Sequence, residues 1–223
     1  MSREGHGVSN PCRRYQAALA NPYGEFFRAL PPLFRRVALI PPSAAELSST
    51  DWLVWKAAVA RHFSWAVPTY EAIEAIGRYA TKVVDMGAGS GYWAWLMRQA
   101  GIDVVAIDEA PPPFTWTKVA KANERVILDH PDRTLFLCWP PWGTDMAFNT
   151  LTLHRGDYVV YVGEWMGGSA NIWFFALLVS GFEAIDWIEI PQWYNRDDRL
   201  FVFRRRQDPA RTDLGGGPIS AKP

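Results

Sequence analysis

Residues 82–92 have the sequence KVVDMGAGSGY, in which three glycines follow a short apolar run. Val83-Val84-Asp85 predicts a buried strand, and the apolar residues after the glycines recur at helical spacing. A glycine turn between a strand and a helix is the context that a nucleotide-binding loop requires. Glycines permit positive φ and let backbone N–H groups approach a ligand closely, while the start of the helix favours a negatively charged group. The stretch therefore predicts a ligand-binding turn.

A second strand follows this helix. Gly101 is placed to end the helix, and residues 104–108 (VVAID) form the next apolar run, so the segment is a strand–helix–strand unit. Asp108 closes the second strand, where an acidic side chain can accept hydrogen bonds from both hydroxyls of a ribose. Asp85 at the end of the first strand would repel a pyrophosphate but suits a ligand that carries an ammonium and a sulfonium group.

Other nucleotide ligands fit this turn less well. Position 92 is not glycine, which departs from the dinucleotide fingerprint, and no Gly-Lys-Ser/Thr follows as a phosphate-binding P-loop needs. An NAD(P)-dependent oxidoreductase is therefore disfavoured. The alternative that the glycines only make a tight turn, with Asp108 capping a strand in solvent, stays open, although it explains one glycine better than three.

Taken together, these residues resemble the cofactor loop of class I S-adenosylmethionine-dependent methyltransferases. The resemblance spans roughly residues 60–205 and extends to a group of small uncharacterised methyltransferase-like proteins with a WPPW motif. It implies a three-layer, Rossmann-like α/β fold with a mostly parallel seven-stranded sheet and an antiparallel last strand. It also implies S-adenosylmethionine as cofactor, held by Asp85, Met86, Gly87, Ala88, Gly89, Gly91, Tyr92 and Asp108.

The rest of the chain fits this architecture. Further strands are predicted at residues 135–138, 158–162, 187–190 and 200–203. Only residues 191–199 separate the last two strands, which is too short for a parallel crossover, so these strands are predicted to pair antiparallel. Helices are predicted from a cap at Asp51 to His62, after a cap at Thr69, and over residues 171–180.

The sequence Trp139-Pro140-Pro141-Trp142 follows the strand expected beside the first one, at the switch point where open α/β sheets bind ligands. It resembles the Asp/Asn-Pro-Pro-aromatic motif of amino methyltransferases that act on adenine, cytosine or glutamine. In those families the polar side chain and a backbone carbonyl accept hydrogen bonds from the target NH2 group, and the aromatic ring stacks on its plane. Here Trp139 stands in place of the polar acceptor.

We therefore predict that Trp139, Pro140, Pro141, Trp142 and Glu164 form the substrate side and the catalytic group. Glu164 follows the strand at 158–162 and could act as a general base or a hydrogen-bond acceptor. Methyl transfer is an in-line displacement, so positioning supplies much of the rate. A purely structural aromatic turn at 139–142 and a solvated Glu164 are the alternatives. Residues 63–69 could form a lid over the site or simply pack between helices.

The expected function is transfer of a methyl group to a planar or amino-group-bearing substrate, which could be a nucleobase, a peptide or a small molecule. A catalytically silent binding or scaffolding subunit is the alternative, because the first position of the Pro-Pro motif is altered.

Composition limits the other possibilities. The chain of 223 residues has 23 Lys and Arg against 23 Asp and Glu, so no strong footprint for duplex nucleic acid is present. Cys12 and Cys138 form no disulfide framework, and the four histidines lack metal-ligand spacing, so no metal site is predicted. The longest apolar run, residues 172–179, is too short to cross a bilayer of about 30 Å, and a cytoplasmic location is expected.

Three regions are expected along the chain. Residues 1–42 should form an irregular N-terminal arm and residues 43–206 the methyltransferase domain with its preliminary helices, followed by a disordered tail at 207–223.

Overall fold

The computed structural model describes residues 19–30, 34 and 49–207. Cys12, most of the predicted N-terminal arm and nearly all of the predicted tail lie outside these residues, so the predictions for them stay predictions.

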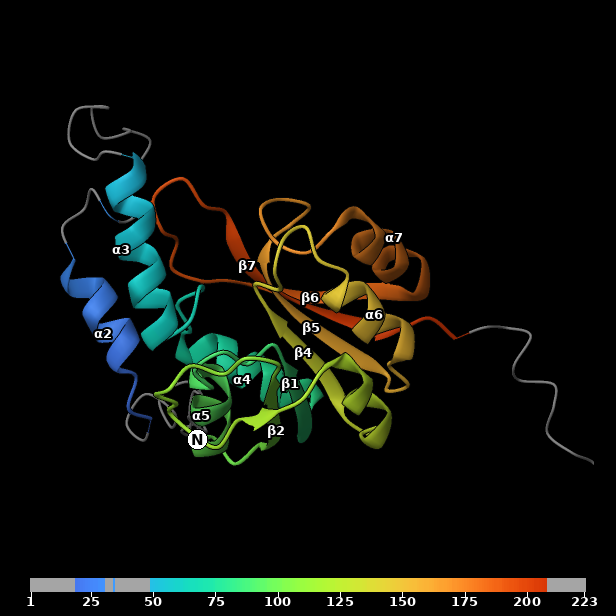
Figure 1. Ribbon diagram of the computed structural model, residues 1–223. Coiled ribbons are helices and arrows are strands. Elements are labelled where there is room, and N and C mark those ends of the chain that lie inside the picture. The colour runs from blue at the N-terminus through green and yellow to red at the C-terminus, as the bar shows by residue number, and fades with distance from the viewer. Residues whose placement is uncertain (1–18, 31–33, 35–48, 208–223) are drawn as a thin grey trace, which may run out of the picture.

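A seven-stranded sheet forms the centre of the described part of the chain (Figure 1), in the order β3-β2-β1-β4-β5-β7-β6. The strands are β1 (Lys82–Met86), β2 (Asp103–Asp108), β3 (Ala120–Lys121), β4 (Thr134–Cys138), β5 (Tyr158–Glu164), β6 (Phe182–Glu189) and β7 (Asp198–Arg205). The first five strands pair in parallel, whereas β7 is antiparallel to both β5 and β6. This confirms the predicted Rossmann-like α/β fold, with a mostly parallel seven-stranded sheet and an antiparallel last strand.

Helices cover both faces of the sheet. One face carries α4 (Tyr70–Tyr79) and α5 (Tyr92–Gln99), with α2 (Pro22–Ala29) and α3 (Ser49–His62) beside them; the other carries the 3-10 helix η2 (Glu124–Asp129), α6 (Met146–Leu153) and α7 (Ile172–Gly181). Because successive side chains of a strand point to opposite faces, Val83 joins the core under α4 and α5, and Val84 joins the core under α6 and α7.

The predicted cap of α4 at Thr69 is confirmed, and α7 begins with a cap of the same kind that was not predicted. The hydroxyl of Thr69 accepts a hydrogen bond from the N–H of Ala72 at 3.1 Å, and the side chain of Asn171 accepts one from the N–H of Phe174 at 2.9 Å. These bonds satisfy donors that have no partner within the first helical turn, and so fix where α4 and α7 begin.

Several predicted boundaries were wrong. Helix α3 begins at Ser49, so Asp51 lies inside its first turn rather than capping it. Strand β6 begins at Phe182, directly after α7, rather than at residue 187, because its first half is exposed and lacks the continuous apolar run of the inner strands. Residues 22–29 were expected to be irregular but form α2, which Asn21 caps by accepting from the N–H of Gly24 at 3.0 Å. Strand β3 and helix α6 were not located in the sequence.

Helix α2 is tied to the start of α5. The Tyr92 hydroxyl donates to Asn21 Oδ1 at 2.8 Å and accepts from the N–H of Tyr23 at 2.9 Å. Asn21 also donates from Nδ2 to the carbonyl of Pro68 at 2.9 Å. These buried bonds hold α2 next to the turn at residues 87–91, with α3 packed alongside it (Figure 1).

Among the residues that the structure describes, no helix has both the length and the apolar character needed to span a bilayer. Within the same ranges, His, Cys, Asp and Glu side chains form no group of three or more that could hold a metal ion.

Candidate functional site

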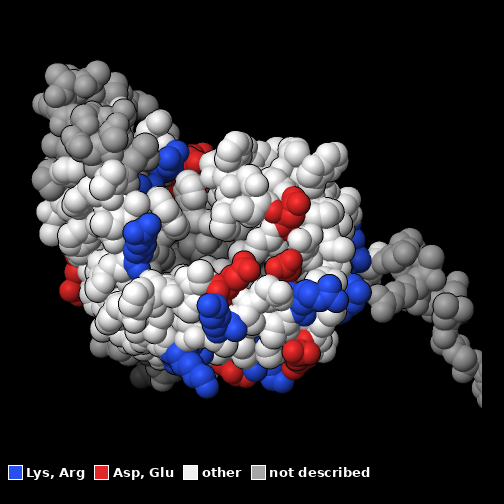
Figure 2. All heavy atoms as spheres, viewed as in Figure 1, with Lys and Arg blue, Asp and Glu red and all other residues white. Residues whose placement is uncertain are grey.

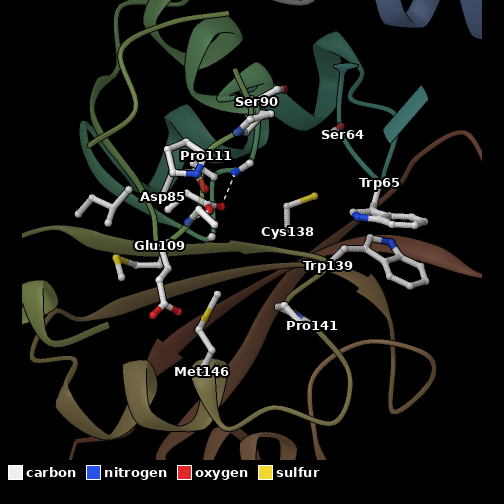
Figure 3. A pocket seen from close by; sticks show the side chains of 18 of the residues that line it. Ser64, Trp65, Asp85, Ser90, Glu109, Pro111, Cys138, Trp139, Pro141 and Met146 are labelled. Carbon is white, nitrogen blue, oxygen red and sulfur yellow. Dashed lines mark hydrogen bonds between the residues drawn. The ribbon is translucent and has the colours of Figure 1, made fainter. Parts of the chain in front are cut away.

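A pocket of about 700 Å³ opens at the carboxyl ends of β1, β2 and β4. It is visible as a hollow in Figure 2 and from close by in Figure 3. Its walls come from the end of α3 and the segment after it, the glycine turn, the loop after β2, the start of η2 and the loop after β4. This is the edge at which open parallel sheets bind ligands, because the strand order reverses between β1 and β4 there.

The glycine turn forms one wall. Gly87, Gly89 and Gly91 have φ values of 76°, 53° and 72°, which L side chains rarely adopt, so the predicted need for glycine is confirmed. The N–H groups of Gly87 and Ala88 both donate to the carbonyl of Ile107, at 2.9 and 3.0 Å, which ties the turn to β2. A Cβ added to Gly89 would meet nothing within 4 Å although this residue lines the pocket. The open space of the pocket therefore extends to the backbone of Gly89.

Asp108 lies in the same wall. Its Oδ2 accepts from the N–H of Gly89 and its Oδ1 from the N–H of Ala110, both at 2.8 Å. The carboxylate thus bridges the glycine turn and the loop after β2, and it faces the pocket. Because a carboxylate oxygen can accept more than one hydrogen bond, both oxygens keep capacity for a ligand.

Asp85 is buried beneath the turn and lines the pocket. Burial, with a smaller contribution from the negative charge of Asp108, raises the pKa of Asp85 to about 8. Glu109 and Glu124, which the sequence analysis did not single out, also line this end of the pocket. Four carboxyl groups around one hollow favour a positively charged ligand.

The predicted cofactor residues divide into two groups. Asp85, Met86, Gly87, Ala88, Gly89 and Asp108 line the pocket. Gly91 does not; it starts α5, and a Cβ there would lie 2.8 Å from Val119 Cγ2, so it shapes the turn from behind. Tyr92 is fully buried, and its hydroxyl is bonded to residues of the α2 segment, so its side chain does not face the pocket, in contrast to the prediction that grouped it with the cofactor residues.

The Trp-Pro-Pro-Trp segment is also divided. Trp139 and Pro141 line the pocket, whereas Pro140 and Trp142 do not. The Trp142 side chain is 73% exposed, and the carbonyl of Pro140 accepts from the N–H of Ala170 at 2.8 Å. Only the first and third positions of the motif are therefore placed to meet a ligand in this pocket.

Trp139 stacks on Trp65, with ring centroids 5.9 Å apart and 29° between the ring planes (Figure 3). Phe63, Ser64 and Trp65 all line the pocket, which favours the lid over simple packing between helices for this segment. In Figure 3, Cys138 lies between Asp85 and the two tryptophans. Burial raises the pKa of the Cys138 thiol well above its ordinary value, so this thiol is not an activated nucleophile.

Glu164 binds residues of two loops beside the pocket. Its carboxylate accepts from the N–H groups of Gly168 at 3.1 Å and Asp197 at 3.2 Å, and lies 3.6 Å from Arg196 Nη1. It does not line the pocket. The structure therefore shows Glu164 joining the loop after β5 to the loop before β7, while its predicted role as a base stays a prediction.

Sequence reasoning missed the residues that complete the pocket from distant elements. These are Ala60 and Arg61 at the end of α3, Glu109 to Pro113 after β2, Ala122 to Glu124 at the start of η2, and Thr144 and Met146 before and in α6. The run Pro111-Pro112-Pro113 and the acidic Glu109 directly after Asp108 were visible signals. The others belong to no motif.

No protein-family model matches the chain, and no curated protein matches it. Solved structures of similar fold include a TehB-like SAM-dependent methyltransferase from Corynebacterium glutamicum, with 18% identity, coverage of 70% of this chain and 97% of that one, and a TM-score of 0.42. Magnesium protoporphyrin IX methyltransferase from Synechocystis, solved with SAM bound, has 9% identity, coverage of 91% and 100%, and a TM-score of 0.44. A structure from work on the conversion of a disulfide bond into a thioacetal group in echinomycin biosynthesis has 15% identity, coverage of 72% and 95%, and a TM-score of 0.45.

Proposed function

We propose that the chain is an S-adenosylmethionine-dependent methyltransferase that acts on a planar or amino-group-bearing substrate. One observation carries this proposal: the open pocket joins a positive-φ glycine turn, a bridging Asp108 and a buried Asp85 at the switch point of a methyltransferase-type sheet. A volume of about 700 Å³ lies within the range of pockets that enclose small-molecule cofactors.

The residues present fit the cofactor. The space beside Gly89 admits a ligand against the backbone, where the start of α5 favours the methionyl carboxylate. Asp108 suits the ribose hydroxyls, and Asp85 suits the ammonium group of the same ligand. Asn123 and Glu124 at the start of η2 supply further polar groups to this wall of the pocket. When bound, the cofactor supplies an electrophilic methyl group on a sulfonium centre.

The chain's own contribution is to position the acceptor and exclude water. Trp65, Trp139 and Pro141 form the apolar side of the pocket away from the carboxyl groups. Among the residues that the structure describes, no activated base lies on this side, since Glu164 is engaged by loop N–H groups and the Cys138 thiol stays protonated. Catalysis in this pocket would therefore depend on holding the acceptor atom in line with the methyl group, which can supply about 7–11 kcal/mol of rate acceleration.

Isothermal titration with S-adenosylmethionine and S-adenosylhomocysteine tests the cofactor site. The wild type should bind both in the micromolar range, about −8 kcal/mol. Asp108→Ala should weaken both by roughly 10- to 100-fold, because it removes charged hydrogen-bond acceptors worth about 1.5–3 kcal/mol. Asp132→Ala is the matched control, since Asp132 is exposed and paired with Lys82 at 2.8 Å, outside the pocket. Absence of any binding heat with the wild type would contradict the proposal.

A methyl-transfer assay distinguishes an active enzyme from a catalytically silent subunit. The altered first position of the Pro-Pro motif, where the indole N–H of Trp139 is already bonded to Asp198, favours a silent subunit as the second candidate. Methyl transfer to any member of a panel of nucleobases, peptides and small aromatic acceptors supports the enzyme. Cofactor binding without transfer to any of them supports a binding or scaffolding role.

A further inference from the structure

A lysine side chain is buried behind the acceptor side of the pocket. Lys56, on α3, is 2% exposed, and within the described part of the chain its Nζ has no hydrogen-bond partner. Three indole rings surround it instead, with centroids 5.3 Å (Trp139), 5.6 Å (Trp65) and 5.7 Å (Trp193) from Nζ. Burial lowers the pKa of Lys56, and the carboxylate of Asp198 opposes that shift. A cation at these distances is attracted to the faces of the rings.

A buried carboxyl group binds the indole N–H of Trp139. Asp198 at the start of β7 is fully buried, and its Oδ1 accepts from Trp139 Nε1 at 2.7 Å. Its Oδ2 has no hydrogen-bond partner among the described residues. Burial raises the pKa of Asp198 and the neighbouring Lys56 opposes the shift, so the two groups compensate one another's charge.

These groups hold Trp139 in a strained conformation. Its φ of 49° is unusual for a bulky residue, and such a conformation persists only where the surrounding structure enforces it. Here the backbone N–H donates to the carbonyl of Val162 at 2.8 Å, the indole N–H is bound by Asp198, and the ring stacks on Trp65. Lys56 and Asp198 do not line the pocket, whereas Trp139 and Trp65 do. The buried pair can therefore act on a ligand through the rings that it contacts, Trp139 above all, and through its charge.

The charges around this ring also limit what can pack against it. Besides Lys56, the guanidinium of Arg196 lies 5.5 Å from the centroid of Trp139, and Arg61 lines the same pocket. Asp198 and Glu164 compensate part of this positive charge, but a further cation at the ring would still lie beside two cations, whereas a neutral flat ring would not meet that repulsion. The opposite end of the pocket, lined by Asp85, Asp108, Glu109 and Glu124, has the reverse preference.

We propose that Asp198 and Lys56 are positioning residues that hold the Trp139 indole as a wall of the acceptor site, and that this wall selects a flat aromatic acceptor without a positive charge. This inference rests on the proposed methyltransferase function, because only that function would make the bound ring a methyl acceptor. The preference for flat rings without a positive charge depends on the surroundings of Trp139 and not on cofactor binding.

Probe binding tests this wall directly. We would titrate 2-naphthol, 2-naphthylmethylammonium and cyclohexanol into the full-length protein, with and without saturating S-adenosylhomocysteine, and follow indole chemical shifts by NMR. The wild type should bind 2-naphthol at least about tenfold more tightly than the ammonium probe, a difference of about 1.4 kcal/mol, and should not bind cyclohexanol measurably. Equal binding of the two naphthyl probes, or no binding of 2-naphthol, would overturn the inference.

Three variants identify the positioning residues. Asp198→Ala removes the indole's acceptor and should weaken 2-naphthol binding by roughly tenfold, while Asp198→Asn keeps a carbonyl oxygen for Trp139 Nε1 and should restore it to within about threefold. Lys56→Met keeps the length of the side chain and should reduce the discrimination against the ammonium probe. Asp132→Ala is again the surface control. A purely structural role would lower stability in these variants without changing probe selectivity, and that result would contradict the inference.

The two proposals fail separately. Lack of S-adenosylhomocysteine binding by the wild type would remove the cofactor function, while the titrations without it would still decide whether the wall selects flat uncharged rings. If Asp198→Ala does not fold, the wild type is compared with Asp198→Asn and Lys56→Met instead. An unchanged preference of Lys56→Met for 2-naphthol over the ammonium probe would overturn the role of the buried pair.

Discussion

The two ends of the pocket are built in different ways. The centre of the cofactor end comes from two short segments, residues 85–91 and 107–110, joined by backbone bonds and by the Asp108 carboxylate, with Asn123 and Glu124 of η2 beside them. The acceptor end brings together Lys56 of α3, Trp65 of the following loop, Trp139 after β4 and Asp198 of β7. A local motif can therefore specify the first end, whereas the second exists only once distant elements have packed.

The two ends also differ in charge. Figure 2 shows blue Lys and Arg side chains on the α3 side of the hollow and red Asp and Glu side chains on the opposite side. Asp85, Asp108, Glu109 and Glu124 line the pocket, and so does Arg61. The excess of carboxyl groups suits a cationic cofactor.

The largest expected effect comes from closing the space at the cofactor end. Gly89→Ala places a methyl group in the open pocket, so it should weaken S-adenosylhomocysteine binding by at least about 100-fold, or about 2.7 kcal/mol. The backbone cost of a non-glycine residue at positive φ is about 1–2 kcal/mol, so the variant should still fold. Isothermal titration measures the affinity and thermal unfolding the stability.

Gly101 provides the matched control for this change. It has a φ of 82°, a Cβ there would also meet nothing within 4 Å, and it lies outside the pocket. Gly101→Ala should cost similar stability and leave ligand affinity unchanged. Equal losses of affinity in both variants would show that backbone strain, rather than the ligand, explains the glycine at position 89.

A smaller effect should appear in the pH dependence at Asp85. Its pKa of about 8 in the free protein means that the carboxyl is largely protonated at pH 6.5, whereas the ammonium group of a bound ligand beside it would favour the carboxylate. Affinity for S-adenosylhomocysteine should rise between pH 6 and 8, by up to about tenfold per unit, with proton release on binding. Asp85→Asn should remove this dependence. A wild-type affinity that is flat over this range would contradict the assignment.

The same group predicts the opposite trend in stability. The folded pKa of Asp85 lies above its unfolded value of 3.8, so the folded state binds more protons, and stability falls as the pH rises from about 4 to about 8. The unfolding temperature of unliganded Asp85→Asn should therefore exceed that of the wild type by a margin that grows over this range. A margin that shrinks instead would show that Asp85 is stabilised as the carboxylate.

The smallest effect is expected where α2 is attached to α5. Tyr92→Phe removes the hydroxyl that pairs with Asn21 and leaves the N–H of Tyr23 unpaired, at a cost of about 1–3 kcal/mol. Hydrogen exchange in residues 22–29 should accelerate, while S-adenosylhomocysteine affinity changes less than about threefold. Tyr79→Phe, whose hydroxyl pairs with Asp186 on a different part of the surface, is the control. A large loss of affinity in Tyr92→Phe alone would show that this side chain supports the cofactor site.

The strand order around the glycine turn was predictable because it follows from local patterns. Positive-φ glycines at 87, 89 and 91 have to lie at a tight turn, and the short link at 191–199 requires the antiparallel pairing of β6 and β7. Strand β3 has two exposed residues, and α2 is a helix of only 8 residues, so neither was predicted. Tyr92 was misplaced because a residue beside a ligand loop can point either to the ligand or to the core.

The chain's residue order was sufficient for the cofactor end, since the interactions there join neighbours along two segments and depend on backbone conformation. Packing alone established the acceptor end. The bond between Trp139 and Asp198 joins residues 59 apart in the chain, and Lys56 reaches the same ring from α3. Such contacts leave no periodic trace in a sequence, because a buried lysine or aspartate is tolerated only after the fold has brought its compensating partners around it.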